Sequence, residues 1–259
     1  MPLVSWRSDG AVTRLTLNRP EALNALSQAL ADEFAAAVKR AAREKTAVVL
    51  LEGEGKAFCA GGDLGFIEDN RKRPAASLAP LMRRFYGSFL SIRALPQVVV
   101  AKVHGSAVGA GLCLALAADL RVVADDARLG FNFVRLGLNP GMAAWPLARA
   151  AFGGARARDL LFTGRFFSGR DLYDWGAASA RAANAADLAQ AAESFAANLA
   201  AASAESLRLL KDESRLGEDL APFLAREARG QARTFKGADL AEGLAAVRER
   251  RPPRFPPSR

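Results

Sequence analysis

Two glycine-rich segments, each set between an apolar run and a helix-forming segment, constrain this 259-residue chain most strongly. They are residues 57–64 (AFCAGGDL) and 104–111 (HGSAVGAG). A tight turn from a strand into a helix leaves unpaired backbone N–H groups at the helix start. Two such turns that face each other predict a site for a negative charge that develops on one oxygen atom. Glycine at the turns lets a bound carbonyl group approach the backbone closely.

Apolar runs that alternate with helical patterns predict an α/β fold. Residues 12–17 alternate as a half-buried strand does, and apolar residues follow Ser27 at helical spacing up to residue 43. Continuous apolar runs are typical of strands buried on both faces, which favours parallel pairing. These runs are residues 47–51, 98–103 and 120–124.

The second half of the chain changes character and becomes helical. Before it, residues 65–91 are expected to form a flexible loop around residues 71–76 and then a helix with Leu81 and Phe85. From Asp187 onward the pattern contains no strand candidate. The expected helices are residues 187–202, 204–216, 222–235 and 238–250.

Composition excludes several classes of protein. The net charge is +9, but the basic residues are spread along the chain, and the clusters at 71–73 and 248–254 lack interleaved aromatic residues, so we expect no nucleic-acid partner. No apolar run reaches the roughly 20 residues of a membrane helix, and the N-terminus lacks signal-peptide features. We therefore expect a cytoplasmic protein with no membrane contact. Cys59 and Cys113 belong to no metal-ligand pattern, so we expect no metal site.

Five short motifs follow one another along nearly the whole chain. They are LNRPEALNAL at 17–26, KAFCAGGDL at 56–64, GAG at 109–111 with Leu114, Ala115 and Asp119, LGLNPG at 136–141, and AEGL at 241–244 with 248–252. In this order they resemble the crotonase superfamily, also called the enoyl-CoA hydratase/isomerase family. The resemblance implies a spiral of ββα units. It also implies an acyl-CoA site within residues 1–195 and a C-terminal helical region, residues 196–259, for trimerisation and site capping.

The same resemblance assigns roles to individual residues. It implies that the backbone N–H groups of Gly62 and Ala110 hold the thioester carbonyl oxygen of an acyl-CoA, and that no cofactor is needed beyond the coenzyme A of that substrate. It places coenzyme A along residues of the first two motifs, with Lys56 as a phosphate contact. These residues are Ala22, Leu23, Lys56, Ala60, Asp63 and Leu64. It further implies a homotrimer or a dimer of trimers, in which the last helices cap a neighbouring subunit.

The chain departs from the family where hydratases carry two glutamates. Cys113 and Phe133 fall at those two positions, and Gly141 stands where some isomerase relatives have an aspartate. Each such acid–base group contributes about a hundred- to ten-thousandfold, so efficient hydration is not expected. The remaining pocket candidates for acid–base work are Glu68, Asp69, Tyr86 and Asn132.

The sequence therefore predicts an enzyme that stabilises a thioester enolate and carries out isomerase or decarboxylase chemistry. Decarboxylation forms the enolate without a base and needs only one proton donor afterwards. The alternative is a non-catalytic family member that binds acyl-CoA. It would bind the thioester without exchanging its α-protons with deuterated water.

Overall fold

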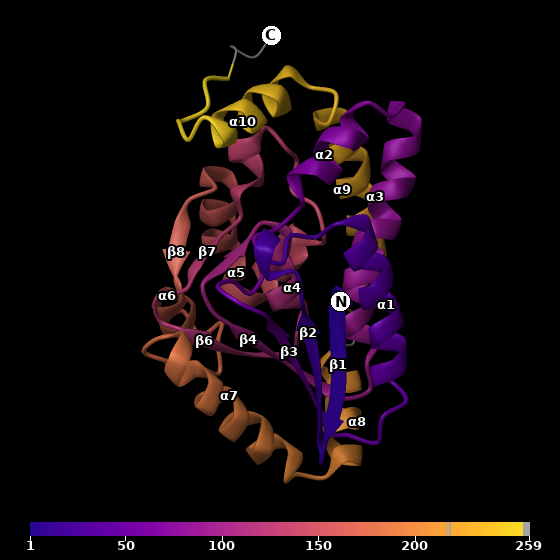
Figure 1. Ribbon diagram of the computed structural model, residues 1–259, viewed down its shortest axis with the longest axis vertical. Helices are drawn as coiled ribbons and strands as arrows, with labels where there is room; N and C mark the ends of the chain where they lie inside the picture. Colours follow the sequence, from indigo (N-terminus) through magenta and orange to yellow (C-terminus); the bar gives the residue numbers. More distant parts are fainter. Residues whose placement is uncertain (216, 218, 256–259) are drawn as a thin grey trace.

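A twisted, mostly parallel sheet forms the centre of the computed structural model, which describes residues 1–255 apart from 216 and 218 (Figure 1). The strand order is β1-β2-β3-β4-β6-β9. All neighbouring pairs after β1-β2 are parallel, as the apolar runs predict. The strands are β1 (Val4–Asp9), β2 (Val12–Leu17), β3 (Val48–Gly53), β4 (Val98–Val103), β6 (Leu120–Ala124) and β9 (Ala180–Ala182).

The first strand was not expected from the sequence. β1 pairs antiparallel with β2 through a turn at Gly10, where φ is +57°. Most of β1 is exposed or half-buried, because it is the edge strand of the sheet. Its side chains therefore show neither the alternation nor the apolar run that marks the other strands.

A second, three-stranded sheet lies beside the first and carries the second glycine-rich turn. Its order is β5-β7-β8, with β5 and β7 parallel and β8 antiparallel to β7. These strands are too short for a periodic sequence signal. They are β5 (Ser106–Val108), β7 (Arg128–Gly130) and β8 (Phe166–Ser168).

Helices cover the sheets. The helix expected after Ser27 is present, and the Ser27 hydroxyl accepts a hydrogen bond from Leu30 N–H (3.2 Å). Gly153, with φ of +71°, kinks the longest helix, α5. The helices of this part are α1 (Gln28–Ala41), α2 (Leu64–Arg71), α3 (Ala75–Leu90), α4 (Ala110–Ala117), α5 (Ala144–Thr163) and α6 (Gly169–Asp174).

The loop expected around residues 71–76 is present but shorter, because residue 71 ends α2 and residue 75 begins α3. Asp63 caps α2 by accepting a hydrogen bond from Phe66 N–H (2.9 Å). Only residues 72–74 separate the two helices. The polar run at residues 71–74 therefore marks the end of α2 and this connection.

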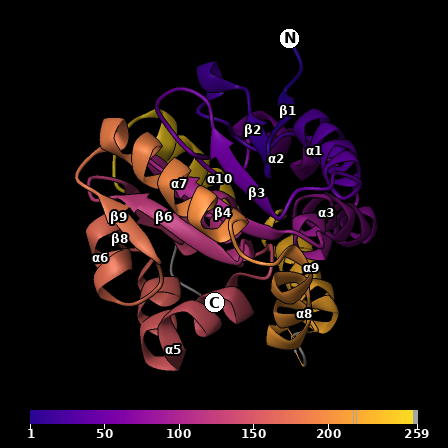
Figure 2. The same cartoon turned by 90° about the horizontal axis from the view of Figure 1, so that it is seen from below.

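The C-terminal helices agree with the sequence pattern. They are α7 (Ala185–Ala200), α8 (Ala204–Ser214), α9 (Ala221–Thr234) and α10 (Ala238–Arg248). Leu216, the expected end of α8, lies outside the described residues. The expected boundary at 195/196 falls within α7, which packs across β6 and β9 (Figure 2). This helix therefore belongs to the α/β core.

The last two helices cover the chain to which they belong. α9 lies along α3, and α10 lies over the top of the molecule in Figure 1. Their expected capping of a neighbouring subunit stays a prediction. Within the chain, Gln231, Phe235 and Val247 line a cavity. The 3-10 helix Asn132–Leu136 (η3) packs against α10, and its residues line the same cavity.

Candidate functional site

Backbone hydrogen bonds hold the two glycine-rich turns side by side. Phe58 N–H donates to His104 O (3.0 Å), and Cys59 N–H donates to Ser106 O (3.0 Å). In return Val108 N–H donates to Cys59 O (3.1 Å). The first turn thus runs as a short parallel partner of β5, and the two turns enter α2 and α4 as neighbours.

Glycines allow the turns to approach each other this closely. A Cβ atom at Gly111 would lie 2.2 Å from Cys59 O, and one at Gly61 would lie 2.6 Å from Val108 O. Gly61 also has a φ of +101°, which side chains other than glycine rarely permit. Ala110 has no positive φ, so its backbone conformation suits an alanine.

The backbone N–H groups of Gly62 and Ala110 are unused within the described chain. Leu26 bonds with the neighbours of Gly62, accepting from Asp63 N–H (3.0 Å) and donating to Gly61 O (2.7 Å). Ala110 is the first residue of α4, where no carbonyl of its own helix can accept its N–H. Among the described residues neither N–H finds an acceptor, and both residues line one cavity of about 290 Å³. Two N–H donors that lack partners in the described chain, on the wall of one cavity, make it a candidate oxyanion site.

The wall of this cavity is almost entirely apolar. Its polar side chains, among the described residues, are Tyr86, Asn132 and Gln231. Phe66 stacks on Phe85 with ring centroids 4.4 Å apart. The apolar side chains are Leu64, Phe66, Ile67, Met82, Phe85, Phe133, Leu136, Leu138, Phe235 and Val247. Phe133, at the position where the resemblance implies a glutamate in hydratases, is therefore part of the apolar wall.

Three of the residues expected along coenzyme A line the cavity: Ala22, Ala60 and Leu64. Leu23 and Lys56 are exposed and are not part of the cavity wall. Asp63 is structural, because it caps α2 and pairs with Arg19 (2.6 Å). Burial opposes its ionisation, but the Phe66 N–H and the Arg19 guanidinium lower the pKa of Asp63.

Four of the expected pocket candidates do not line the cavity. Glu68 forms an ion pair with Arg248, and both Glu68 and Asp69 face a separate open hollow beyond Phe235. The Cys113 thiol is fully buried against Gly141 O (3.8 Å), and burial raises its pKa, so it is not a thiolate nucleophile. Gly141 itself has no room for a side chain, because a Cβ there would lie 2.7 Å from Tyr86 Oη.

Two buried polar residues of α9 were not predicted from the sequence. Gln231 accepts a hydrogen bond from Tyr86 Oη (2.8 Å), and Glu227, one turn earlier, accepts one from Ala143 N–H (2.6 Å). Burial raises the pKa of Glu227 to about 7, although backbone N–H groups at the start of α5 oppose this. Both residues lie in an ordinary amphipathic helix, and only the packing of α9 on α3 brings them to the site.

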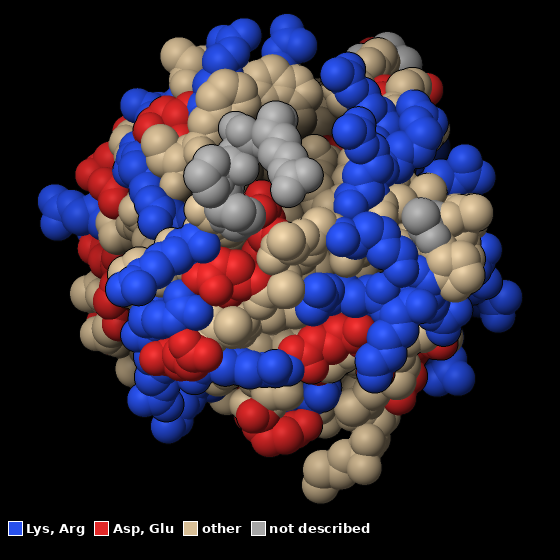
Figure 3. All heavy atoms as spheres, turned by 90° about the horizontal axis from the view of Figure 1, so that it is seen from above, with Lys and Arg blue, Asp and Glu red and all other residues tan. Residues whose placement is uncertain are grey.

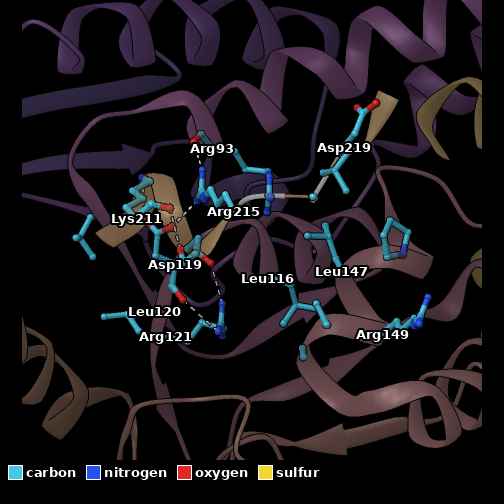
Figure 4. Close-up of a pocket in the computed structure, with 18 of the residues that line it drawn as sticks. Arg93, Leu116, Asp119, Leu120, Arg121, Leu147, Arg149, Lys211, Arg215 and Asp219 are labelled. Atoms are coloured by element: carbon cyan, nitrogen blue, oxygen red, sulfur yellow. Dashed lines mark hydrogen bonds and ion pairs between the residues drawn. The ribbon is translucent and has the colours of Figure 1, made fainter. Parts of the chain in front are cut away.

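A second cavity is larger, about 760 Å³, but lies away from both turns. It separates α5 from α8, and Leu116 and Leu147 are on its wall (Figure 4). Its carboxylate Asp119 is held by Lys211 (2.8 Å) and by Arg215, as the dashed lines in Figure 4 show. The smaller cavity is the candidate active site, because it alone contains the two unused amides.

Within the described residues, no group of His, Cys, Asp and Glu could hold a metal ion. Over the same residues, no helix is both long and apolar enough to cross a membrane.

The fold and the paired turns define a class of acyl-CoA enzymes, and comparisons with known proteins agree. The chain matches the family described as enoyl-CoA hydratase/isomerase over residues 7–257. It is 34% identical to the 1,2-epoxyphenylacetyl-CoA isomerase of Escherichia coli, covering 98% of each chain. It is 33% identical to the human mitochondrial enoyl-CoA hydratase domain-containing protein 2, covering 95% of this chain and 86% of the relative.

Solved structures give the same result. An enoyl-CoA hydratase from Mycobacterium avium subsp. paratuberculosis superposes with a TM-score of 0.85 at 27% identity, over 98% of this chain and 99% of the other. OdaA of Pseudomonas aeruginosa superposes with a TM-score of 0.83 at 29% identity, over 95% of this chain and 99% of the other. This chain belongs to the enoyl-CoA hydratase/isomerase family and has the crotonase fold.

The buried carboxyl group of Glu227 makes stability depend on pH. The pKa of Glu227 in the folded state is about 7, above the ordinary value of 4.5. Its contribution to the free energy of unfolding is therefore complete below pH 4.5 and is lost as the pH rises through about 7. From this group we expect a loss of roughly 3 kcal/mol in the free energy of unfolding between about pH 5 and about pH 8. Urea unfolding across this range measures it.

In the same measurement, Glu227→Gln should make the free energy of unfolding depend less steeply on pH. Glu21→Gln, whose side chain is 72% exposed, should leave the slope as in the wild type. Equal slopes for the wild type and Glu227→Gln would contradict this reading of the buried carboxyl.

Proposed function

We propose that the chain is an acyl-CoA enzyme that stabilises a thioester enolate between Gly62 N–H and Ala110 N–H. The observation that carries the proposal is that Gly62 and Ala110, whose N–H groups are unused elsewhere in the described chain, line the same small cavity. Removal of a group from the α-carbon of a thioester moves charge onto the carbonyl oxygen, and preorganised N–H donors lower that barrier. Coenzyme A enters as part of the substrate, and no further cofactor is invoked.

Within this chemistry we propose isomerisation or decarboxylation rather than hydration. Hydration needs a polar site for an activated water molecule, and the wall near Phe133 is apolar. Neither hydratase glutamate is present, and the replacements Cys113 and Phe133 cannot do their work. The Escherichia coli relative is named as an isomerase, which is compatible with this choice.

Coenzyme A is proposed to lie beside Ala22, Leu23 and Leu64, with its phosphates toward Lys56. The molecule carries a strongly basic face that suits a polyanionic group: seen from above, Lys and Arg side chains cover much of one side (Figure 3). The hollow next to the cavity adds Arg71, Lys72 and Lys236. We propose the cytoplasm as the compartment, as expected from the sequence.

The second candidate, a non-catalytic acyl-CoA-binding protein, is favoured by the scarcity of ionisable side chains on the cavity wall. Among described residues only Tyr86 can ionise there. Such a protein would bind thioesters without converting any of them. Turnover of a β,γ-unsaturated or an α-carboxylated acyl-CoA by pure protein separates the two candidates.

Replacing Gly62 tests the amide directly. Gly62→Pro removes the N–H donor, whereas Gly62→Ala keeps it, because a Cβ there would meet only Ile67 at 3.4 Å. We expect Gly62→Pro to lower kcat by about a hundred- to a thousandfold and Gly62→Ala to have a much smaller effect. Circular dichroism and thermal melting check that both variants fold. Similar activities for two folded variants would show that this amide is not used.

We also propose that copies of the chain associate as a homotrimer or a dimer of trimers through the larger cavity. Its wall is mostly apolar, and large apolar side chains are exposed at or beside it: Leu209 (52%), Leu210 (62%) and Phe223 (37%). Exposed apolar surface of this kind marks protein contacts.

The oligomer is tested by sedimentation velocity. We expect the wild type to sediment as three or six subunits and Leu210→Asp to shift toward the monomer, because a charge in an apolar contact is costly. Phe162→Asp, at an exposed site outside the cavity, is the matched control. A monomeric wild type would overturn the proposal.

A further inference from the structure

The active-site cavity contains one described side chain that can give up a proton. Its polar side chains are Tyr86, Asn132 and Gln231, and the two amides do not ionise near neutral pH. Asp69 and the Glu68–Arg248 pair lie in the neighbouring hollow. Among the described side chains on the cavity wall, Tyr86 is therefore the one that can donate a proton.

Gln231 fixes the Tyr86 hydroxyl in place. The Gln231 amide donates through Nε2 to Asn139 O (3.0 Å), which can only accept. Its Oε1 must then face Tyr86 and accept the hydroxyl hydrogen (2.8 Å). Tyr86 is thus held by a helix, α9, that is far from it in sequence, while the Phe85 ring packs edge-on against it (centroids 5.5 Å).

The pair occupies the space that a side chain at position 141 would need. A Cβ at Gly141 would lie 2.6 Å from Gln231 Nε2 and 2.7 Å from Tyr86 Oη. The family resemblance places the aspartate of some isomerase relatives at this position. Glycine at this position instead leaves room for the hydroxyl group of Tyr86, which lies on α3.

Tyr86 is held in its neutral form. Burial raises the pKa of its hydroxyl far above the usual range, and the charge of nearby Glu227 acts in the same direction, while the bond to Gln231 opposes both. A neutral phenol can donate a proton to a strongly basic enolate carbon but cannot remove one from a thioester. With no other ionisable group on the described wall, the enolate must form without a side-chain base.

We propose that Tyr86 is the catalytic proton donor, that Gln231 is its positioning residue, and that the substrates are short CoA thioesters carrying a carboxylate on the α-carbon. This inference rests on the proposed enolate function. The bond between the α-carbon and the carboxylate breaks, its electron pair passes to the α-carbon and the carbonyl oxygen, and CO₂ leaves. The hydroxyl of Tyr86 then turns about its C–O bond, its hydrogen leaves Gln231 Oε1, and the α-carbon takes that proton. Water returns a proton to the phenolate, and the bond to Gln231 forms again.

The cavity suits this class of substrate in two further ways. Its volume of about 290 Å³ is at the low end for ligand pockets, which favours a short acyl group. Its phenylalanine-rich wall provides little solvation for a carboxylate and so favours the neutral product CO₂.

The stereochemistry of protonation tests the donor. Methylmalonyl-CoA in deuterated water should give propionyl-CoA with one deuterium at the α-carbon and, in the wild type, one enantiomer. Tyr86→Phe keeps the ring but removes the donor, so the product should become a near-equal mixture, while CO₂ release, which precedes protonation, falls less. Gln231→Leu should lose part of the stereochemical preference. Tyr173→Phe changes the only other tyrosine, half-exposed on α6, and should behave as the wild type.

Two results would overturn the inference. One is a single enantiomer from folded Tyr86→Phe. The other is a wild type that isomerises 3-butenoyl-CoA but decarboxylates none of malonyl-, methylmalonyl- and ethylmalonyl-CoA, which would leave the enolate function standing. Turnover of neither substrate class would instead remove the proposed function itself.

Discussion

The parallel pairing of the two glycine-rich turns is the constraint on which the rest of the site depends. Cys59 forms the centre of this pairing, because its N–H and its C=O both bond to the β5 segment. Gly111 packs its backbone against Cys59 O at a distance that excludes any side chain. These contacts fix the starts of α2 and α4 relative to each other. Two helix N-termini with unused N–H groups then face the same small volume.

The remaining walls of the site come from distant parts of the chain. α3 supplies Met82, Phe85 and Tyr86, and α9 supplies Gln231 and closes the cavity. The chain thus completes the cavity with its own residues. Glu227 of α9 accepts a hydrogen bond from Ala143 N–H, and this buried carboxyl links α9 to the start of α5. An apolar cavity wall strengthens the effect of amide dipoles on a carbonyl oxygen, because fewer water molecules compete for it.

Local sequence patterns were sufficient for much of the fold and for the two turns of the site. Continuous apolar runs predicted β3, β4 and β6, and the glycine-rich segments predicted the two turns and the helices α2 and α4 that follow them. The choice of Gly62 and Ala110 within the turns came from the family resemblance. Edge strand β1 and the three-residue strands of the second sheet were not predicted, since an exposed or very short strand has no periodic signal.

The acid–base residues of the site could not be predicted from local sequence, because long-range packing brings them together. Tyr86 was one candidate among seven, and nothing local distinguished it from Glu68 or Cys113. Its role in the structure comes from a partner 145 residues later, Gln231. From the sequence, Gly141 was interpreted as the loss of an aspartate that some isomerase relatives have. In the structure, the absence of a side chain at Gly141 leaves room for Tyr86.

The central claim, that Gly62 N–H and Ala110 N–H together hold a thioester carbonyl, is tested most directly by infrared difference spectroscopy. Acetyl-CoA labelled with carbon-13 at the carbonyl isolates the stretching band of that one bond. On binding to the folded protein, the account predicts a shift to lower frequency than in water, and a smaller shift in Gly62→Pro than in Gly62→Ala. A carbonyl band that stays at its frequency in water when the ligand is bound would contradict the account.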